Sequence, residues 1–345
     1  MFIRNLTKPV KVKNITIGHQ NKIVIQSMTN TKTSDVVSTL NQINELVAYG
    51  CEIVRLAIVD QEDLVGLKEL VKLAKVPLVA DIHYDPSLAI GAIKANVAKI
   101  RINPGNFPNL KAFSEVIKLC KKYHTAMRIG MNTGSLPFGV NTNEQIIELI
   151  GQYIKICEQH NFNQIVLSIK DTDYQRTIEL YELLAKNFAY PLHIGVTEAG
   201  DLYTSSVRST LALSKLINEQ IGDTIRISIS GDPVQEVKLA KVLLQECGLD
   251  VNLTKFIGCP TCGRMGKRYF ELLKIIKPFI DQNPKHNITV AVMGCTVNGV
   301  QESKKADLGI YCYQNDFVIY YQQKFIGKFN LETAIKTFKE LYLKY

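Results

Sequence analysis

The sequence predicts an α/β protein, a (β/α)8 TIM barrel followed by a smaller α+β domain. Two observations carry this prediction: eight short β-rich runs alternate with helix-like segments, and most of these runs end in polar residues. The chain has 345 residues, more than a single core usually supports. A barrel of about 250 residues, by contrast, can be one domain.

The eight runs are apolar nearly throughout, which is typical of a parallel sheet covered by helices. Helix-like segments such as 36–50 and 145–159 lie between them. An open doubly wound sheet is the alternative. The polar run ends favour the barrel, because the active site of a TIM barrel lies at the carboxyl ends of its strands. The runs are IVIQSM (23–28), EIVRLAI (52–58), PLVADIH (77–83), AKIRIN (98–103), AMRIGMN (126–132), QIVLSIK (164–170), PLHIGVTE (191–198) and DTIRISIS (223–230).

The last barrel helix begins at Pro233 and stops at Gly248, so the barrel domain is predicted to span residues 1–250 and the second domain 251–345. The second domain alternates helix-like and β-rich segments without a Gly/Ser linker. Its expected elements are a helix at 267–282, a turn at 283–287, strands at 288–294 and 306–311, a hairpin at 316–329 and a terminal helix at 331–345.

Composition limits the functional class. Hydrophobic residues make up 46% and charged residues 21%, which is ordinary globular usage. No apolar run has the length of a signal peptide or a membrane span, so a cytoplasmic protein without a membrane partner is expected. The net charge of +9 comes from scattered lysines, so nucleic-acid binding is not expected. A basic surface suits a phosphorylated substrate or an acidic electron carrier.

The eight cysteines divide into two groups. Five lie in or beside barrel elements or after an apolar strand and are expected to be structural: Cys51, Cys120, Cys157, Cys247 and Cys312. The other three are Cys259 and Cys262 in a C-x-x-C turn and Cys295, with the carboxylate of Glu302 seven residues later. Thiolates suit zinc as well as iron-sulfur clusters. A zinc site that adds His286, or no metal, therefore stays open from spacing alone.

Cationic residues form a second group, because Arg55, Arg101, Arg128 and Lys170 fall on four different predicted strands. Buried cations need counter-charges. A diphosphate is one candidate, since Arg presents a donor fork that matches phosphate oxygens. Structural ion pairs with Asp81 and Glu198 are the alternative.

Nine motifs, taken in order and spacing, resemble one family over nearly the whole chain. They resemble the 4-hydroxy-3-methylbut-2-enyl diphosphate synthases in their short bacterial two-domain form, which are iron-sulfur enzymes of the methylerythritol phosphate route to isoprenoids. The motifs are QSMTNTKT (26–33), VRLAI (54–58), PLVADIHY (77–84), KIRINPGN (99–106), RIGMNTGSL (128–136), GVTEAG (195–200), IGDTIRISISGDP (221–233), CPTCGR (259–264) and VMGCTVNG (292–299).

The resemblance implies a reaction and a cofactor. In that reaction 2-C-methyl-D-erythritol 2,4-cyclodiphosphate is reduced by two electrons, loses water and becomes 4-hydroxy-3-methylbut-2-enyl diphosphate. One 4Fe-4S cluster per subunit would be held by Cys259, Cys262, Cys295 and Glu302. The catalytic residues implied are Glu302, because a carboxylate leaves iron more readily than a thiolate, and Glu198, a proton donor candidate. The substrate-binding residues implied are Arg55, Asp81, Arg101, Arg128, Asn132, Lys170 and Ser228.

The resemblance also implies partners: a flavodoxin or ferredoxin as electron donor and a head-to-tail homodimer in which one subunit's cluster caps the other's barrel. Two further functions are weighed against it. One is a zinc-stabilised barrel hydrolase or aldolase that uses Asp81, His83, Lys170 and Glu198. The other is a non-catalytic paralogue that binds the cyclodiphosphate.

The chain departs from the family after Cys295. The family usually has NGPGE there, whereas this chain has Asn298-Gly299-Val300-Gln301-Glu302. The departure bears on the turn expected around Glu302, because Gly adopts a positive φ readily and Gln does so only at a cost.

Overall fold

The computed structural model describes residues 4–107, 109–249 and 251–345. The chain forms two compact units, Met1–Leu243 and Leu244–Tyr345, and the boundary between them in the sequence falls within helix α8 (Pro233–Glu246). The boundary predicted at residue 250 stays a prediction.

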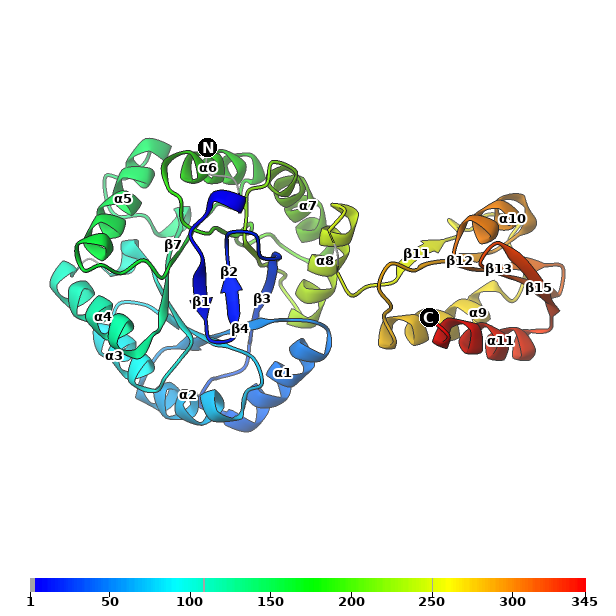
Figure 1. Cartoon of the computed structure of the whole chain (residues 1–345), viewed down its shortest axis with the longest axis horizontal. Coiled ribbons are helices and arrows are strands. Elements are labelled where there is room, and N and C mark those ends of the chain that lie inside the picture. Colours follow the sequence, from blue (N-terminus) through cyan, green and yellow to red (C-terminus); the bar gives the residue numbers. More distant parts are fainter. Residues whose placement is uncertain (1–3, 108, 250) are drawn as a thin grey trace. The chain divides into compact units, whose positions relative to one another are not determined.

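The first unit is an eight-stranded parallel barrel, so the predicted fold class is confirmed (Figure 1). The strand order is β8-β7-β6-β5-β4-β3-β10-β9, and a bridge between Leu167 and Leu192 joins the two ends. The last two strands are much shorter than their runs, because only two residues of each make regular ladder pairs. The strands are β3 (Val24–Met28), β4 (Ile53–Ile58), β5 (Leu78–Ile82), β6 (Lys99–Ile102), β7 (Ala126–Asn132), β8 (Ile165–Lys170), β9 (His193–Ile194) and β10 (Thr224–Ile225).

Helices surround these strands (Figure 1). Seven of them begin at an Asp, Asn or Thr whose side chain accepts a hydrogen bond from a backbone N–H of the first turn. These caps fix where each strand-to-helix loop ends, and so they help to place the polar strand ends. The helices are α1 (Val36–Ala48), α2 (Gln61–Leu73), α3 (Pro86–Lys94), α4 (Leu110–Tyr123), α5 (Asn143–Gln159), α6 (Tyr174–Asn187), α7 (Leu202–Asn218) and α8. The described residues also form three 3-10 turns: η1 (Arg4–Leu6), η2 (Pro104–Asn106) and η3 (Thr133–Ser135).

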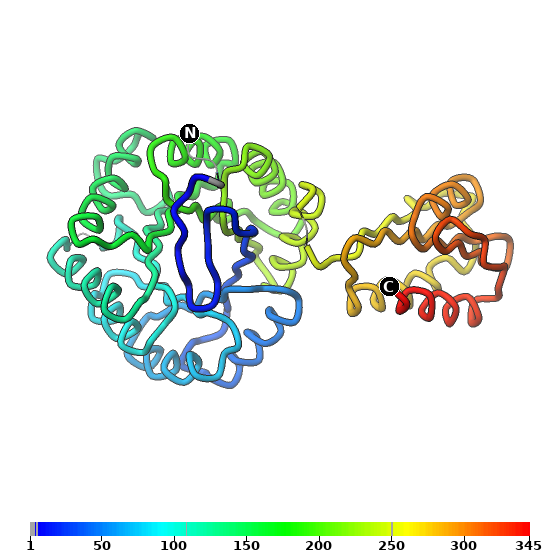
Figure 2. Tube along the Cα trace, viewed as in Figure 1, coloured from blue at the N-terminus to red at the C-terminus, as the bar shows by residue number. Residues whose placement is uncertain are grey.

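A hairpin of β1 (Val10–Val12) and β2 (Ile15–Ile17) packs against the amino-terminal part of the barrel strands (Figure 2). Its side chains join an apolar cluster with Val24, Ile53 and Val79. This cluster forms the floor of the barrel. Arg55, Asp81, Arg128 and Lys170 lie closer to the carboxyl ends of the same strands.

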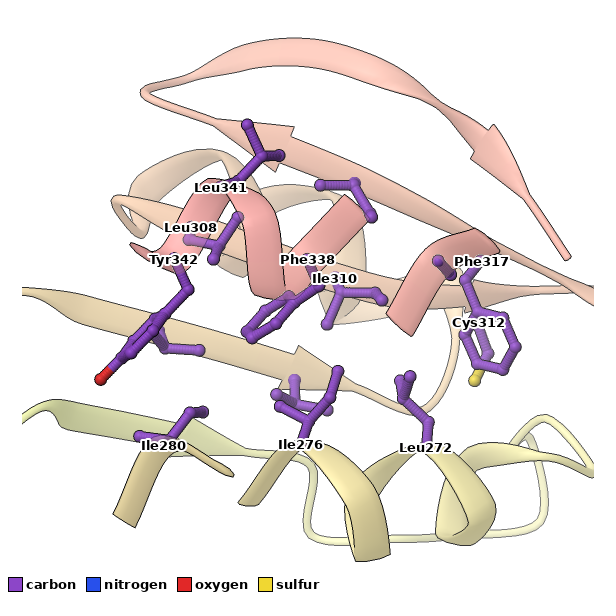
Figure 3. Packing of buried hydrophobic residues seen from close by; sticks show 14 of the residues in the cluster. Leu272, Ile276, Ile280, Leu308, Ile310, Cys312, Phe317, Phe338, Leu341 and Tyr342 are labelled. Atoms are coloured by element: carbon purple, nitrogen blue, oxygen red, sulfur yellow. The ribbon is translucent and has the colours of Figure 1, made fainter. Parts of the chain in front are cut away.

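The second unit is a five-stranded mixed sheet of order β11-β12-β13-β14-β15. Helices α9 and α11 share one core with one face of the sheet, as Figure 3 shows, and α10 packs on β12 and β13. The elements are β11 (Lys255–Gly258), α9 (Tyr269–Gln282), β12 (Thr289–Met293), α10 (Thr296–Lys305), β13 (Leu308–Tyr313), β14 (Asp316–Tyr321), β15 (Lys324–Phe329) and α11 (Leu331–Leu343).

Helix α10 corrects the expectation for the segment after Cys295. A turn was expected around Glu302, but residues 296–305 form a continuous helix. Neither Val300 nor Gln301 has a positive φ. The replacement of Pro-Gly by Val-Gln is therefore compatible with the local backbone, because both residues are ordinary helix formers.

Candidate active site

The carboxyl ends of the barrel strands enclose a cavity of about 130 Å³. All seven residues that the sequence singled out for substrate binding line this cavity. Their role as substrate ligands stays a prediction. The full lining is Arg55, Asp81, His83, Arg101, Arg128, Asn132, Ser168, Lys170, Thr197, Arg226 and Ser228.

Asp81 is the centre of an ion-pair network in this cavity. Its Oδ1 lies 3.1 Å from Arg101 Nη1, and its Oδ2 lies 3.5 Å from Arg55 Nε. Burial alone would raise the pKa of Asp81, but the charges of Arg55 and Arg101 hold it well below its usual range. Arg101 Nη1 also lies 2.7 Å from His83 Nε2. The ion-pair alternative is thus correct for Asp81, which orders two of the predicted cations.

Arg226 and Glu236 are site residues that the sequence reasoning missed. Glu236 is buried in the first turn of α8, and its carboxylate lies 3.0 Å from Arg226 Nη2 and accepts a hydrogen bond from Ser27 Oγ at 2.8 Å. A period of two along 223–230 places Arg226 on the same face as the predicted residue Ser228. That spacing is the signal that could have found Arg226.

The cavity holds more positive than negative charge. Five cationic side chains and one carboxylate line it. Arg128 Nε and Nη1 and Arg101 Nε are buried, and none has a hydrogen-bond partner among the described residues. Burial, then the nearby arginines, lower the pKa of Arg128 well below its usual range. Buried donors of this kind are normally satisfied, so an anion that brings the missing acceptors would suit this arrangement.

Gly130 on β7 keeps this cavity open. A Cβ at this position would lie 2.7 Å from Ser168 Oγ and 3.1 Å from Arg128 Nε. Both atoms belong to cavity-lining residues, so a side chain here would displace groups that line the cavity.

Glu198 is placed differently from its expectation. It lies beyond the end of β9 with a left-handed φ of 49°. Its side chain is exposed and does not line the cavity. The short pairing of β9 explains this, because the strand ends four residues before Glu198 and the following chain is a loop.

The predicted metal ligands lie in the second unit, where β11 and β12 end. Cys259 follows β11, and its N–H donates to Val292 O of β12. The turn closes when Met265 N–H donates to Cys262 O at 3.0 Å and Gly266 N–H donates to Gly294 O at 2.7 Å. The C-x-x-C turn is thereby tied to the residue that precedes Cys295.

Close packing brings two of these ligands near each other. A Cβ at Gly294 would lie 3.2 Å from Cys259 Sγ, so this thiol sits against the backbone next to Cys295. Glu302 lies on α10, seven residues after Cys295, which is the residue that precedes the helix. Thr261 has a left-handed φ of 58°, and strain of this kind in a non-glycine residue is common at ligand sites.

Within the described ranges, no three His, Cys, Asp or Glu side chains meet at metal-binding distance. A cavity of about 330 Å³ nevertheless opens beside Cys295. The three thiols after β11 and β12 and the carboxylate on α10 form a donor set that suits an iron-sulfur cluster. The predicted ligands therefore fit such a group chemically.

His286 does not support the zinc alternative. It precedes β12, whereas Cys259 and Cys295 follow the far ends of β11 and β12. At about 3.3 Å per residue, the intervening strand separates His286 from Cys295 by roughly 25 Å. Cys312, expected to be structural, is buried in the core under α9 and α11 (Figure 3), where burial raises the pKa of its thiol to about 12.

Comparison with known protein families decides the classification. The sequence model described as the GcpE TIM-barrel domain matches residues 7–241, and that of the GcpE protein C-terminal domain matches residues 255–344. The chain belongs to the GcpE family. This confirms the resemblance found from the motifs.

Curated GcpE relatives are named 4-hydroxy-3-methylbut-2-en-1-yl diphosphate synthase (flavodoxin). The protein from Malacoplasma penetrans is 43% identical, over 98% of this chain and 95% of that one. The protein from Geobacillus thermodenitrificans is 41% identical, over 98% of this chain and 91% of that one. Such similarity over nearly the full length extends to both units.

Solved structures share the barrel fold of this GcpE chain. Dihydropteroate synthase from Yersinia pestis matches with a TM-score of 0.52 at 12% identity and covers 70% of this chain and 98% of its own. The spore coat polysaccharide biosynthesis protein spsE from Bacillus subtilis matches with a TM-score of 0.52 at 10% identity, over 70% of this chain and 74% of its own. At these identities the likeness concerns the fold alone.

None of the helices in the described part of the chain is long and apolar enough to cross a membrane.

Proposed function

We propose that this chain catalyses the reductive ring opening of 2-C-methyl-D-erythritol 2,4-cyclodiphosphate to 4-hydroxy-3-methylbut-2-enyl diphosphate. The substrate takes up two electrons and one proton, the ring C–O bond breaks to leave a diphosphate, and the hydroxyl departs as water. The observation that carries this proposal is the anion-ready cationic cavity in the barrel of a GcpE chain. The identity of the product is taken from the names of the relatives.

The barrel residues would bind and orient the cyclic diphosphate. Arg101 and Arg128 hold donors without partners, and the Arg fork matches two phosphate oxygens at once. Lys170 adds a point charge, and burial lowers its pKa well below its usual range, with the nearby Arg128 and Arg226 lowering it further. Binding of an anion reverses that shift and favours the ammonium form. Asn132 and Ser228 add neutral donors at the rim of the cavity.

We propose that Cys259, Cys262, Cys295 and Glu302 hold one 4Fe-4S cluster per subunit. Such a cluster supplies single electrons at low potential when bound. The three cysteines would act as thiolates and Glu302 as a carboxylate ligand. Cys262 is exposed on its turn, and Cys259 and Cys295 are half-buried, so the site is open to a second molecule.

Glu198 is proposed as the proton donor to the departing hydroxyl. Its exposed position on a loop beyond β9 suits a group that reaches the substrate when the site closes. We further propose flavodoxin as the electron donor, because the relatives' names specify it. A head-to-tail homodimer in the cytoplasm completes the proposal.

The test is turnover without oxygen. The purified chain is given the cyclodiphosphate and chemically reduced flavodoxin, and the product is identified by mass spectrometry. Formation of the linear diphosphate at a rate that depends on flavodoxin is expected. Hydrolysis or cleavage without consumption of electrons would instead support a barrel hydrolase or aldolase, and tight binding without turnover would support the non-catalytic paralogue.

A further inference from the structure

The barrel interior contains a lysine that the proposed function does not use. Lys99 on β6 is 0% exposed. Its Nζ donates to Gln26 Oε1 at 3.2 Å. Since β3 and β6 are not neighbours in the sheet, this contact crosses the interior of the barrel. Lys99 precedes Arg101 by two residues, so both side chains lie on the inward face of β6.

Lys99 has no counter-charge of its own. Among the residues that the structure describes, no carboxylate lies within salt-bridge distance of its Nζ. Gln26 Oε1 is a neutral acceptor, and a fully buried lysine is rare unless it is paired. An ammonium group here would stay poorly compensated in the free protein.

The charged neighbours of Lys99 further disfavour an ammonium group at this position. Both nearby carboxylates are engaged with arginines, Asp81 with Arg55 and Arg101, and Glu236 with Arg226. Burial lowers the pKa of Lys99 well below its usual range, and the charges of Arg128 and Arg55 lower it further. The titratable and charged groups that the structure places around the barrel interior are Arg55 (β4), Asp81 (β5), His83 (just after β5), Arg101 (β6), Arg128 (β7), Lys170 (β8), His193 (β9), Arg226 (just after β10) and Glu236 (α8).

We propose that Lys99 is a positioning residue that takes up a proton when a dianionic diphosphate enters the barrel mouth. The proposal rests on the proposed function only for the identity of the anion. The amine of Lys99 accepts one proton from solvent, and the resulting ammonium attracts the phosphates without touching them. It keeps its hydrogen bond to Gln26 Oε1. The positive charge of Lys99 is thus present only when a bound anion balances it.

This coupling has a defined pH dependence. An anion raises the pKa of Lys99 in the complex above that in the free protein, so the complex binds more protons. Affinity therefore rises as the pH falls, until Lys99 is already protonated in the free protein. As the pH rises through the pKa of the complex, the contribution of Lys99 to binding is lost.

Proton uptake can be measured by calorimetry. Binding of the cyclodiphosphate to the cluster-loaded protein, without reductant, is titrated at one pH in two buffers that differ in ionisation enthalpy. Each phosphorus of this ligand carries a single strongly acidic group, so the ligand does not itself titrate near neutral pH. We expect the wild type to take up protons and Lys99→Met to take up about one fewer per site. The variant should also bind several-fold more weakly.

The matched control is Lys241→Met. Burial also lowers the pKa of Lys241, but this half-buried side chain on α8 packs against Gly50 and not in the barrel interior. It should take up as many protons as the wild type. Unchanged proton uptake in Lys99→Met would overturn the proposal.

Two further measurements separate the possible failures. If Lys99→Met does not fold, the combination of Lys170→Met, His83→Gln and His193→Gln leaves Lys99 as the remaining interior amine or imidazole among the described residues. Uptake that persists there supports the proposal, and complete loss contradicts it. Sulfate serves as a second dianion. If sulfate binds with uptake that depends on Lys99 but the cyclodiphosphate does not bind, the proposed substrate fails and the role of Lys99 stands.

Discussion

The two candidate sites differ in how complete they are without their ligands. In the barrel mouth, buried side chains on the strands are already held by ion pairs, and three arginine nitrogens wait for acceptors. At the carboxyl ends of β11 and β12, an exposed turn and the residue before α10 carry the thiols. No three potential metal ligands in the described part of the chain lie within metal-binding distance of one another. The rigid strand framework would fix the proposed anion site in advance, whereas the proposed metal site would gain much of its geometry from the metal.

The largest expected effect separates the two sites. Cys262→Ala should reduce flavodoxin-dependent turnover by more than about 100-fold. Mutation of a residue that only contacts a metal ligand already costs about 10- to 100-fold in activity, and loss of the ligand itself should cost more. Binding of the cyclodiphosphate to the barrel should stay within the error of calorimetry. Weakened binding of equal size would show that the two sites are not independent.

The next effect concerns the ion pairs of the barrel. Asp81→Asn should lower the free energy of unfolding at pH 7 by about 3 kcal/mol, since it leaves buried arginines without their carboxylate. The folded pKa of Asp81 lies below the unfolded value, so its contribution is present above about pH 4 and is lost as the pH falls toward the folded pKa. Urea unfolding between pH 3 and 7 should show a weaker acid dependence in the variant. An identical pH profile would contradict the role of Asp81.

Arg128→Met tests the unsatisfied donors. Affinity for the cyclodiphosphate should fall by roughly 10- to 100-fold, the value of a charged hydrogen bond. The free protein should be as stable as the wild type or more so, because a buried cation without an acceptor is removed. Calorimetry and thermal unfolding check the two halves of this prediction. A variant that binds normally would refute the assignment of Arg128 to the anion.

The smallest effect is expected at the departure from the family motif. Gln301→Gly brings back the family's glycine, but it should destabilise the chain by about 1 kcal/mol, since this exposed residue is inside a helix. Iron content should not change. A gain in iron or in turnover would mean that the proposed ligand Glu302 needs a more flexible backbone than α10 provides.

The positions of the barrel strands could be predicted from the sequence, whereas the lengths of two strands and helix α10 in the second unit could not. The apolar runs marked all eight strands, because burial on both faces leaves a continuous hydrophobic signal. The predicted lengths of β9 and β10 were wrong, because only two residues of each strand make regular ladder pairs. Helix α10 was missed, since Asn298 and Gly299 are weak helix formers and only packing on the sheet stabilises the segment.

The site followed a similar pattern. Cations at strand ends could be predicted, because strand parity and the carboxyl-end rule locate them. Glu236 could not be predicted, because an acidic residue in the first turn of a helix is normally a surface residue that interacts favourably with the helix dipole. Its inward position depends on a tertiary contact with Arg226 that no local pattern contains.

One measurement tests the central claim, that a cluster on the second unit serves an anion site in the barrel. Iron, sulfide and the visible spectrum are determined for protein purified without oxygen, for the wild type, Cys262→Ala and Cys247→Ala. The account predicts a brown wild type with about four irons per chain, an unchanged Cys247→Ala, whose thiol is half-buried just after α8, and a bleached Cys262→Ala. A colourless wild type, or equal iron in all three proteins, would contradict it.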